Sequence, residues 1–522
     1  MKKVLFFAFS ILLMFVLIGC GSNKTESVTT TGGPVLTFAP RTTKTKSPAV
    51  TTVTTSPANI TTITTEKQPI EIEDGYDYKG TKKVKIYYCN WNIASEELAE
   101  TDMERLMINE FMKQYPNITV EVVAKPASEE GTWNEWLTMR ASIGSLPDVI
   151  MPDNIPLYIE NGWISDVTEY TEKDSEYANL AAAVKGATTY NGHVLALPLA
   201  VHYYGYVVNK TLFESRNVKA PNTSTTMEDF IEKIQDAANH SAKDGSGVAG
   251  LSGIEHILHW YPANLNPNLQ WWAFDGTEFK LNSDEYKATV AKYLELRRAT
   301  DICVDFLEGD REEIFGTFDL ANSGKLLAYY AGSYTFAGMQ KNINDGTYNW
   351  SLDFIGTPVI NGNKVNPTSM DFICVSSTTK HPEEAYLLAR WMGFSNLGYL
   401  KRLELSKSVE GITAVNFPPL QNNEVLLNKY FELYPSFTGL RTIIESGSFV
   451  MENQKNLPGY NVARYTGTYD SEHNMFQMLA DVMDGTVDYA DICVQYNEKA
   501  NSLFNSYYND TFLPALNKLI GE

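Results

Sequence analysis

The residues of this chain that could perform chemistry do not form a common catalytic pattern. The chain has no GxSxG nucleophile elbow, no phosphate-binding P-loop and no HExxH zinc motif. His256 and His259 are three residues apart and could ligate a metal, but no Glu or Cys partner follows at useful spacing. We therefore expect no catalytic residues, no metal site and no cofactor.

Aromatic and planar polar side chains are the more informative groups. The chain contains nine tryptophans and thirty tyrosines. Sugars offer apolar C–H faces and rings of hydroxyls, so a sugar site combines aromatic platforms with Asn, Asp, Glu, Arg or His at the ring edges. Because most aromatic residues of a globular protein lie in its core, only those in loops at the ends of strands are candidates.

Strand and helix patterns alternate from residue 82 onward. Strands are predicted at 84–88, 118–123 and 146–151, separated by helical patterns at 96–114 and 136–143. This alternation is typical of an α/β fold with a mostly parallel sheet and helices on both faces. Further helices are predicted at 226–238, 283–299, 382–392 and 490–507, and further strands at 326–330, 350–355 and 372–376. The GxGxxG match at 245–250 follows a polar helix end, so we interpret it as a loop entering a strand, not as a dinucleotide site.

The beginning of the chain indicates export. Lys2 and Lys3 precede an apolar run at 4–18, which is shorter than the roughly 20 residues of a membrane-spanning helix. The run ends in Leu-Ile-Gly-Cys, which resembles a bacterial lipobox with Cys20 as the lipidated residue. An ordinary signal peptide with a chance cysteine is the alternative. We predict a signal peptide at 1–19 and a lipid anchor on Cys20.

A threonine-rich segment follows the expected cleavage site. Residues 20–80 contain repeated Thr runs and few aromatic residues, so burial cannot offset the entropy of ordering them. We predict a disordered tether there, followed by one binding domain at 81–522. The four remaining cysteines (Cys89, Cys303, Cys374 and Cys493) are far apart, and we interpret them as small buried hydrophobes, with a disulfide left open.

The net charge limits the possible partners. The formal charge is −21 and 43% of the residues are hydrophobic, which is a normal globular balance with an acidic surface. Nucleic-acid binding is disfavoured because phosphate contacts need clustered Lys and Arg.

Several segments occur in an order that carries a family resemblance. They are Leu-Pro-Asp-Val at 146–149, Tyr-Asn-Gly-His-Val-Leu-Ala-Leu-Pro at 190–198, Tyr-Val-Val-Asn-Lys-Thr-Leu-Phe at 206–213, Gly-Lys-Leu-Leu-Ala-Tyr-Tyr-Ala-Gly-Ser-Tyr at 324–334, Phe-Ile-Gly-Thr-Pro at 354–358, and the run from Ile373 to Ala385 with Trp391-Met392. In this order the chain resembles the extracellular solute-binding proteins of bacterial ABC importers, in the branch that includes maltose-binding protein. The resemblance covers about residues 83 to 507.

The resemblance implies a two-lobed, type II periplasmic-binding-protein-like fold with the ligand cleft at the hinge. Lobe one is expected at about 83–200 and 367–399, and lobe two at about 201–366 and 400–522. Ligands in open α/β sheets lie outside the carboxyl ends of the strands, which agrees with a cleft between the lobes.

The resemblance also nominates the ligand-binding residues. They are Asn90, Trp91, Asn92, Asp153, Asn154, His202, Tyr203, Trp271, Trp272, Tyr334 and Asp371. His202 stands where relatives can carry a carboxylate, and Tyr334 stands where relatives often carry a stacking tryptophan. Asp153 could equally cap the next helix, Trp91 could belong to the core, and one of the two adjacent tryptophans is expected to point inward.

The expected function is capture of a carbohydrate, specifically an oligosaccharide, and its delivery to the permease subunits of an ABC transporter. The protein would be a monomer anchored on the extracellular face of the cell membrane. Two alternatives remain open: a peptide or polyamine ligand, with Asp153 and Asp371 as ammonium partners, or a secreted carbohydrate-active enzyme. The enzyme would need two carboxylates about 5 Å or 6.5–9.5 Å apart in a cleft.

Overall fold

The structure is a computed structural model that describes residues 72, 74–93, 99–126, 131–307 and 309–521. The predicted signal peptide, the lipidation site Cys20 and most of the predicted tether lie outside the described residues.

The first part of the domain is the predicted β/α alternation. It consists of β1 (Val84–Cys89), α2 (Met103–Gln114), β2 (Ile118–Val122), α3 (Trp133–Ser142) and β3 (Val149–Ile150). Strand β1 pairs in parallel with both β2 and β3, as the alternation predicts. The first residues of the helix predicted at 96–114 lie outside the described residues. Helix α2 begins at Met103, where the Asp102 side chain caps it by accepting from the backbone N–H of Glu104.

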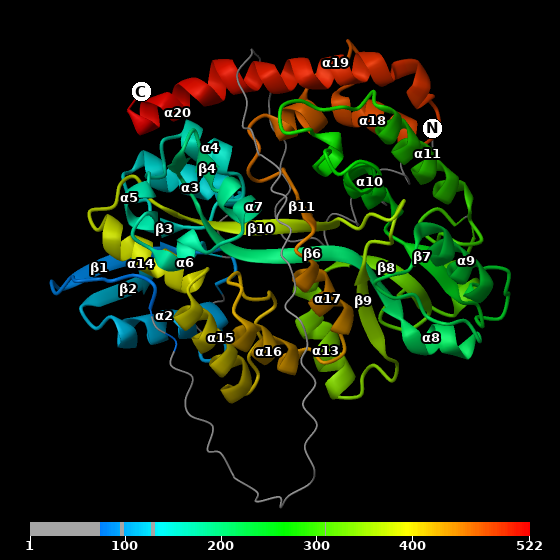
Figure 1. The fold of residues 1–522 in the computed structure, drawn as a ribbon, viewed down its shortest axis with the longest axis horizontal. Coiled ribbons are helices and arrows are strands. Elements are labelled where there is room, and N and C mark those ends of the chain that lie inside the picture. The colour runs from blue at the N-terminus through cyan, green and yellow to red at the C-terminus, as the bar shows by residue number, and fades with distance from the viewer. Residues whose placement is uncertain (1–71, 73, 94–98, 127–130, 308, 522) are drawn as a thin grey trace, which may run out of the picture.

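Two long strands run through the middle of the molecule (Figure 1). They are β6 (Leu197–Asn209) and β10 (Asn366–Val375), which pair antiparallel with each other. Strand β10 continues the sheet to β3, and β6 continues it to β8 (Leu326–Gly332) and β9 (Leu352–Gly356). The main path of the sheet is therefore β2-β1-β3-β10-β6-β8-β7, with β7 at Ala249–Ser252. The pattern predicted only 372–376 of β10, because its first half lacks an apolar run.

The second part of the sheet carries a further parallel pair. Strand β7 (Ala249–Ser252) lies beside β8, so the GxGxxG segment does enter a strand. The three clearest helical patterns become α9 (Met227–Ala237), α11 (Asp284–Arg298) and α14 (Pro382–Met392). The other strands, and the other α-helices before the C-terminal pair, are α4 (Ile155–Glu160), α5 (Thr168–Thr171), α6 (Ser175–Ala178), α7 (Ala182–Gly186), β4 (Thr189–Tyr190), β5 (His193–Val194), α8 (Lys210–Ser215), α10 (Ile257–Leu265), α12 (Arg311–Phe315), α13 (Phe336–Asn344), α15 (Asn396–Ser408), α16 (Glu424–Leu433), α17 (Thr438–Ser446), β11 (Phe449–Met451) and α18 (Met475–Met483).

Two large hydrophobic cores lie among the described residues, and the first extends across the crossing strands to Phe336 of α13 and Phe354 of β9. The first contains the side chains around β1 to β3 and α14, and the second contains those around β7, α9, α10, α11 and α18. Leu403, Tyr430 and Leu440, which the expected division assigns to lobe two, pack in the first core. Helices α15 to α17 follow the last crossing predicted near Tyr399 but return to the first core because their apolar faces meet it.

The C-terminal helices span both halves of the molecule. Helix α19 (Tyr489–Tyr507) packs on the second core, and a π-helical turn (Tyr508–Phe512) leads into α20 (Leu513–Ile520). Phe512 belongs to the first core, with its ring 5.7 Å from that of Tyr190. Figure 1 shows this red segment running along the top of the molecule, from above α18 to above α4.

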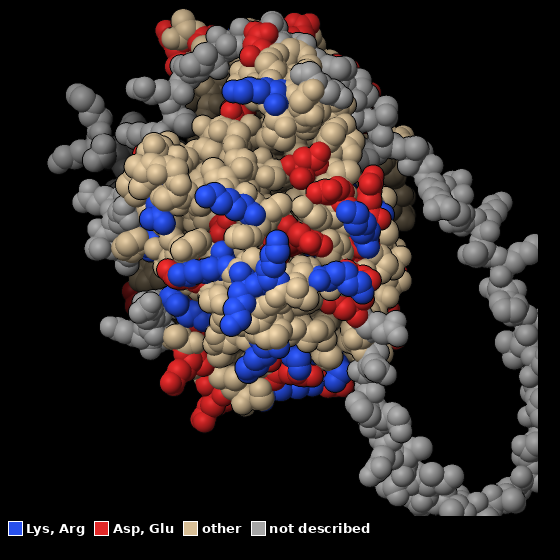
Figure 2. Space-filling model, turned by 90° about the vertical axis from the view of Figure 1, so that its left-hand side faces the viewer, with Lys and Arg blue, Asp and Glu red and all other residues tan. Residues whose placement is uncertain are grey.

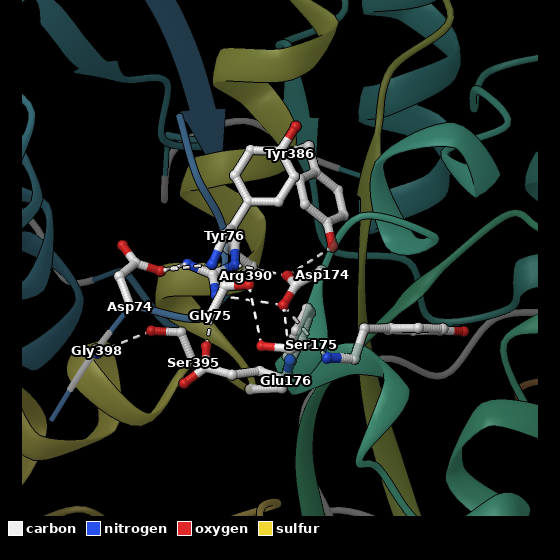
Figure 3. Close-up of polar contacts among 12 residues, drawn as sticks. Asp74, Gly75, Tyr76, Asp174, Ser175, Glu176, Tyr386, Arg390, Ser395 and Gly398 are labelled. Carbon is white, nitrogen blue, oxygen red and sulfur yellow. Dashed lines mark hydrogen bonds and ion pairs between the residues drawn. The ribbon is translucent and has the colours of Figure 1, made fainter. Parts of the chain in front are cut away.

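The described domain begins before residue 81, inside the predicted tether. Asp74 accepts from the Arg390 guanidinium at 2.5 Å, and Tyr76 is 6% exposed with its hydroxyl donating to Glu383. Arg390 also bonds Asp174 and Glu176, so residues 74–78 are held against α14 and α6 (Figure 3). The threonine-rich composition ends before these residues, and the two aromatic rings at 76 and 78 have a surface to cover.

Charges of both signs are interspersed on the described surface. Figure 2 shows basic and acidic side chains mixed over the end of the molecule formed by the first part of the domain. The pairs include Lys85 with Glu121, and Lys113 with Glu110 at 2.5 Å. Cys89, Cys303, Cys374 and Cys493 are buried and free, as the small-hydrophobe interpretation predicts.

Candidate functional site

A cavity of about 420 Å³ opens where β1 ends and the two long strands cross. It is bounded by the turn after β1, the first turn of α2, the middle of β6 and β10, and the loop after α15. The residues that line it include Asn90, Asn92, Glu104, Leu199, Ala200, His202, Asp371, Arg402, Thr413 and Phe417. Four of the predicted ligand-binding residues therefore share this cavity.

The turn after β1 is built by Asn90. Its side-chain oxygen accepts from the backbone N–H of Asn92 at 2.7 Å, and its amide nitrogen donates to the Tyr88 hydroxyl at 2.9 Å. Asn90 is 2% exposed. Its side chain shapes the turn, which leaves Asn92 and Trp91 as the residues that the turn presents.

Three charged or polar groups meet at the centre of the crossing. Asp371 lies between two partners: its Oδ1 is 2.5 Å from Lys455 Nζ and its Oδ2 is 3.3 Å from His202 Nε2. Burial by itself would raise the pKa of Asp371, but Lys455 and His202 outweigh it and hold that pKa well below its usual range. Asp371 is therefore ionised near neutral pH and already paired.

Tyrosine rings continue the site from the crossing toward β8. The Tyr334 ring stands edge-on to His202, with centroids 5.5 Å apart, and edge-on to Tyr204 at 6.1 Å. Tyr204 stacks on Tyr330 at 5.9 Å, and Tyr330 stacks on His256 at 4.2 Å. The row of rings therefore runs from the hinge strands to the end of β7. We use the name inter-lobe cleft for the cavity of about 420 Å³ together with the residues that continue from its His202 and Asp371, which are this row of rings, Lys455 and the turn after β3.

The groups along this row are deep in the molecule and still touch solvent. Burial raises the pKa of Glu255 and lowers that of His256 to about 4. Their side chains nevertheless keep 32% and 24% of their surface accessible. Burial also raises the pKa of Glu452, although the positive charges of Lys455 and Arg464 act to lower it. These side chains are therefore largely desolvated, and those of Glu255 and His256 still reach solvent.

Several polar atoms around the cleft have no partner among the described residues. They are the Nε and Nη1 atoms of Arg464, both ring nitrogens of His259, the Tyr330 hydroxyl and Oδ1 of Asp153. Arg464 is 5% exposed, and its guanidinium lies over the Tyr465 ring at 4.1 Å. It sits in a π-helical turn (Val462–Thr466), a distortion that is frequent at functional sites. Buried donors and acceptors without partners are costly, and a hydroxyl-rich ligand could satisfy them.

Some predicted residues lie away from the cleft. Tyr203 alternates with His202 and Tyr204 along β6, so its ring points to the other face and packs edge-on to Phe449 at 6.5 Å. Trp272 has no exposed surface and donates its indole N–H to the Tyr286 hydroxyl. Trp271 is also buried and stacks on His259 at 4.8 Å. The expectation that one ring of this pair points outward is wrong, and Trp271 contributes by supporting His259.

The turn after β3 is closer to the expected arrangement. Asp153 accepts from the Asn134 side-chain amide through Oδ2 at 3.0 Å, and burial raises its pKa. Asn154 is the N-cap residue of α4 and makes no capping hydrogen bond with its side chain. The expectation that Asp153 could cap this helix is not met, since Asn154 occupies the capping position.

Sequence reasoning missed the segment after β11. Glu452 and Lys455 enter the cleft there, and the backbone N–H of Ile155 in α4 donates to the carbonyl of Lys455 at 2.9 Å. The short apolar run that forms β11 after Gly447 is the signal that could have marked a further crossing. Without that crossing, nothing in the sequence connects Glu452 or Arg464 with Asp153.

The fold places the chain in a known class. Two α/β halves around crossing strands are the architecture of type II periplasmic binding proteins. The chain belongs to the bacterial extracellular solute-binding proteins, since the model of that family matches residues 107–409, more than half of the chain.

Solved structures agree on the fold. An ABC substrate-binding protein from Listeria monocytogenes in complex with cycloalternan has a TM-score of 0.57 and 18% identity, covering 80% of this chain and 98% of the other. The cyclic α-maltosyl-1,6-maltose binding protein from Arthrobacter globiformis has a TM-score of 0.58 and 14% identity, covering 81% and 99%. The maltose-maltodextrin binding protein of Alicyclobacillus acidocaldarius has a TM-score of 0.52 and 13% identity, covering 80% and 100%. These likenesses show the fold of sugar-binding proteins of ABC transporters.

No cluster of three or more His, Cys, Asp or Glu residues in the described part of the chain is arranged to hold a metal ion. None of its helices combines the length and the apolar character needed to cross a membrane.

Proposed function

We propose that this protein captures an oligosaccharide in the inter-lobe cleft and delivers it to the permease subunits of an ABC transporter. It does so as a monomer, anchored through lipid on Cys20 at the extracellular face of the cell membrane, and without catalysing a reaction. We propose the lobe division expected from the sequence for this cleft, with Leu403, Tyr430 and Leu440 of α15 to α17 packing in the first core.

One observation carries this proposal. The cleft combines a row of aromatic rings, Tyr204, Tyr330 and Tyr334, with buried donors and acceptors that lack partners. Sugar rings need this combination because they present apolar faces and hydroxyls that both donate and accept.

The charges favour a neutral sugar over a cationic solute. A polyamine or peptide ammonium would need ionised carboxylates that are free to pair, but Asp371 is already paired with Lys455, and burial raises the pKa of Asp153 and of Glu452. Arg464 and Glu452 face the same region with opposite charge and form no ion pair with each other within 4.0 Å. A hydroxyl group between them can accept from one and donate to the other.

The test is a thermal-shift screen of the chain from residue 20 onward, purified without its lipid. The ligands are maltose-, cellulose- and xylan-derived oligosaccharides, with amino acids, peptides and polyamines alongside. A ligand that binds only the folded state adds about 2.7 kcal/mol of stability at a hundred times its Kd. We expect a clear rise in Tm for one saccharide series and no product by chromatography. A shift with polyamines alone would overturn the sugar assignment, and product formation would overturn the assignment as a binding protein.

A further inference from the structure

A second cavity lies outside the inter-lobe cleft, between α4 and the C-terminal helix α20. Its volume is about 460 Å³, which is within the range of roughly 300–1,000 Å³ that is typical of small-molecule sites. The end of α4, the loop at 161–166 and one face of α20 form its walls. In Figure 1, α20 passes above α4 at the end of the red C-terminal segment. None of the residues nominated for saccharide binding lines this cavity, so it is separate from the cleft.

Glu160, the last residue of α4, has an unsatisfied carboxyl group at this cavity. Its side chain forms no hydrogen bond and no ion pair within 4.0 Å with the described residues, and its Oε1 is buried. Burial raises the pKa of Glu160 to about 7, so the carboxyl group is ionised in a large share of the molecules at and above neutral pH. A buried carboxylate without a partner is costly, and a ligand that supplies a cation would remove that cost.

The other charged groups at the cavity leave its interior favourable to a positive charge. Burial by itself would raise the pKa of Asp166, but hydrogen bonds from Thr168 and His193 outweigh it and lower that pKa, so Asp166 is ionised. Lys518 of α20 also lines the cavity, but it is exposed and forms no ion pair within 4.0 Å with a carboxylate of the described chain. Both α4 and α20 end at this place, and the C-terminal end of a helix carries a partial negative charge.

Apolar side chains form the rest of the wall. They belong to Ile159 of α4, Ile164 of the loop and Leu519 of α20. A hydrated inorganic cation gains nothing from contact with such side chains. An alkylammonium does, because its charged end can pair with a carboxylate while its alkyl chain is removed from water.

We propose that the cavity between α4 and α20 is a second binding site of this protein, and that it takes a small primary alkylammonium whose charged end pairs with Glu160. The alkyl chain of this ligand lies against Ile164 and Leu519. The inference goes beyond the proposed function, because neither the site nor the ligand class depends on the saccharide cleft.

The experiment uses n-butylammonium chloride as the probe and n-butanol as its uncharged match. Saturation-transfer NMR on the chain from residue 20 onward measures the Kd at pH 8 and at pH 5.5, at constant ionic strength. At pH 8 we expect a Kd on the order of millimolar for n-butylammonium and a Kd at least about tenfold higher for n-butanol. At pH 5.5 the Kd for n-butylammonium should be at least about tenfold higher than at pH 8, because Glu160 takes up a proton.

Four variants test the residues of the site. Glu160→Gln should raise the Kd for n-butylammonium at least about tenfold at pH 8 and remove its pH dependence. Glu498→Gln is the matched control, since Glu498 is exposed on α19 and does not line the cavity; it should leave the Kd within about twofold. Ala515→Met narrows the cavity without changing its charge and should weaken binding. Lys518→Met removes a like charge and should strengthen binding modestly.

Several results would overturn the inference. They are no binding of n-butylammonium at pH 8, equal affinity for n-butanol, or equal affinity in Glu160→Gln and the unmodified chain. Binding that appears only in Lys518→Met would show that Lys518 itself occupies the site. A pH dependence that persists in Glu160→Gln would assign the titration to another group, such as His193, and not to Glu160. Saccharide binding should be the same in Glu160→Gln and in the unmodified chain, so the proposed function stands or fails separately.

Discussion

Two arginines of this protein are buried to nearly the same extent, and their surroundings differ completely. Arg390 is 1% exposed and bonds Asp74, Asp174 and Glu176 at 2.5, 2.7 and 2.5 Å (Figure 3). Arg464 is 5% exposed and has no ion pair within 4.0 Å among the described residues. Aromatic rings cover it instead: Tyr465 at 4.1 Å and Trp272 at 5.6 Å.

The difference indicates that Arg390 stabilises the fold, whereas Arg464 is available to bind a ligand. A guanidinium cannot lose its proton in a protein, so its burial without acceptors costs several kcal/mol. At Arg390 the chain supplies every acceptor itself, and the result is a fixed joint between residues 74–78 and the first core. At Arg464 the chain leaves donors unused beside the inter-lobe cleft, which makes sense where a ligand supplies the oxygens.

The largest expected effect is on stability, at the structural arginine. Arg390→Met leaves the Asp174 and Glu176 carboxylates buried without a cation. We expect the free energy of unfolding to fall by about 3–5 kcal/mol, measured by urea denaturation followed by circular dichroism at neutral pH. Arg464→Met is the matched control and should leave the same quantity unchanged or raise it, because it removes a buried guanidinium whose Nε and Nη1 have no acceptor among the described residues. Similar losses in both variants would show that the two arginines do not differ in role.

The second effect is on binding, at the other arginine. Arg464→Met removes two unused donors, so we expect the Kd for the best saccharide to rise at least tenfold while Tm stays constant or increases. Arg464→Lys keeps the charge but loses the planar guanidinium, so its Kd should lie between those of the unmodified chain and of Arg464→Met. Titration calorimetry measures both variants. An affinity within twofold of the unmodified chain would place Arg464 outside the ligand site.

The smallest effect concerns a carboxyl group that is buried without a partner and that, unlike arginine, can become neutral. Glu160, on α4, has Oε1 buried without a partner, and burial raises its pKa to about 7. A carboxyl group, unlike a guanidinium, can take up a proton, so its stabilising contribution is complete below pH 4.5 and is lost as the pH rises through about 7. We expect Glu160→Gln to be more stable than the unmodified chain by about 1 kcal/mol at pH 8 and equal to it at pH 4. A constant difference from pH 4 to pH 8 in urea denaturation would contradict this.

The sequence predicted the architecture better than the site, for physical reasons. The strands that became β1 and β2, and helix α14, were readable because their apolar residues repeat with the period of a strand or a helix. Side-chain direction was not readable at the crossing. His202, Tyr203 and Tyr204 are all aromatic, and only the pairing of β6 with β10 shows that the first and third face the cleft.

Long-range contacts set the other limit. Trp271 and Trp272 looked like stacking groups, but an apolar ring in a loop has no sequence mark that separates a ligand platform from a core residue. Lys455 meets Asp371 only because β11 brings the segment after it across the sheet beside β10. The family resemblance predicted a cleft between the lobes, whereas the packing of the side chains determines which aromatic rings line it.

The C-terminal segment has a practical consequence for anyone who builds a sensor from this protein. Helix α19 sits on the second core, whereas the ring of Phe512, one π-helical turn later, sits on the first. Any rotation about β6 and β10 must bend that turn or slide α20 along α4. The fluorescence of a reporter attached near Lys518 would therefore change when one lobe moves relative to the other. A bulky purification tag in the same place would hinder that movement even without ligand.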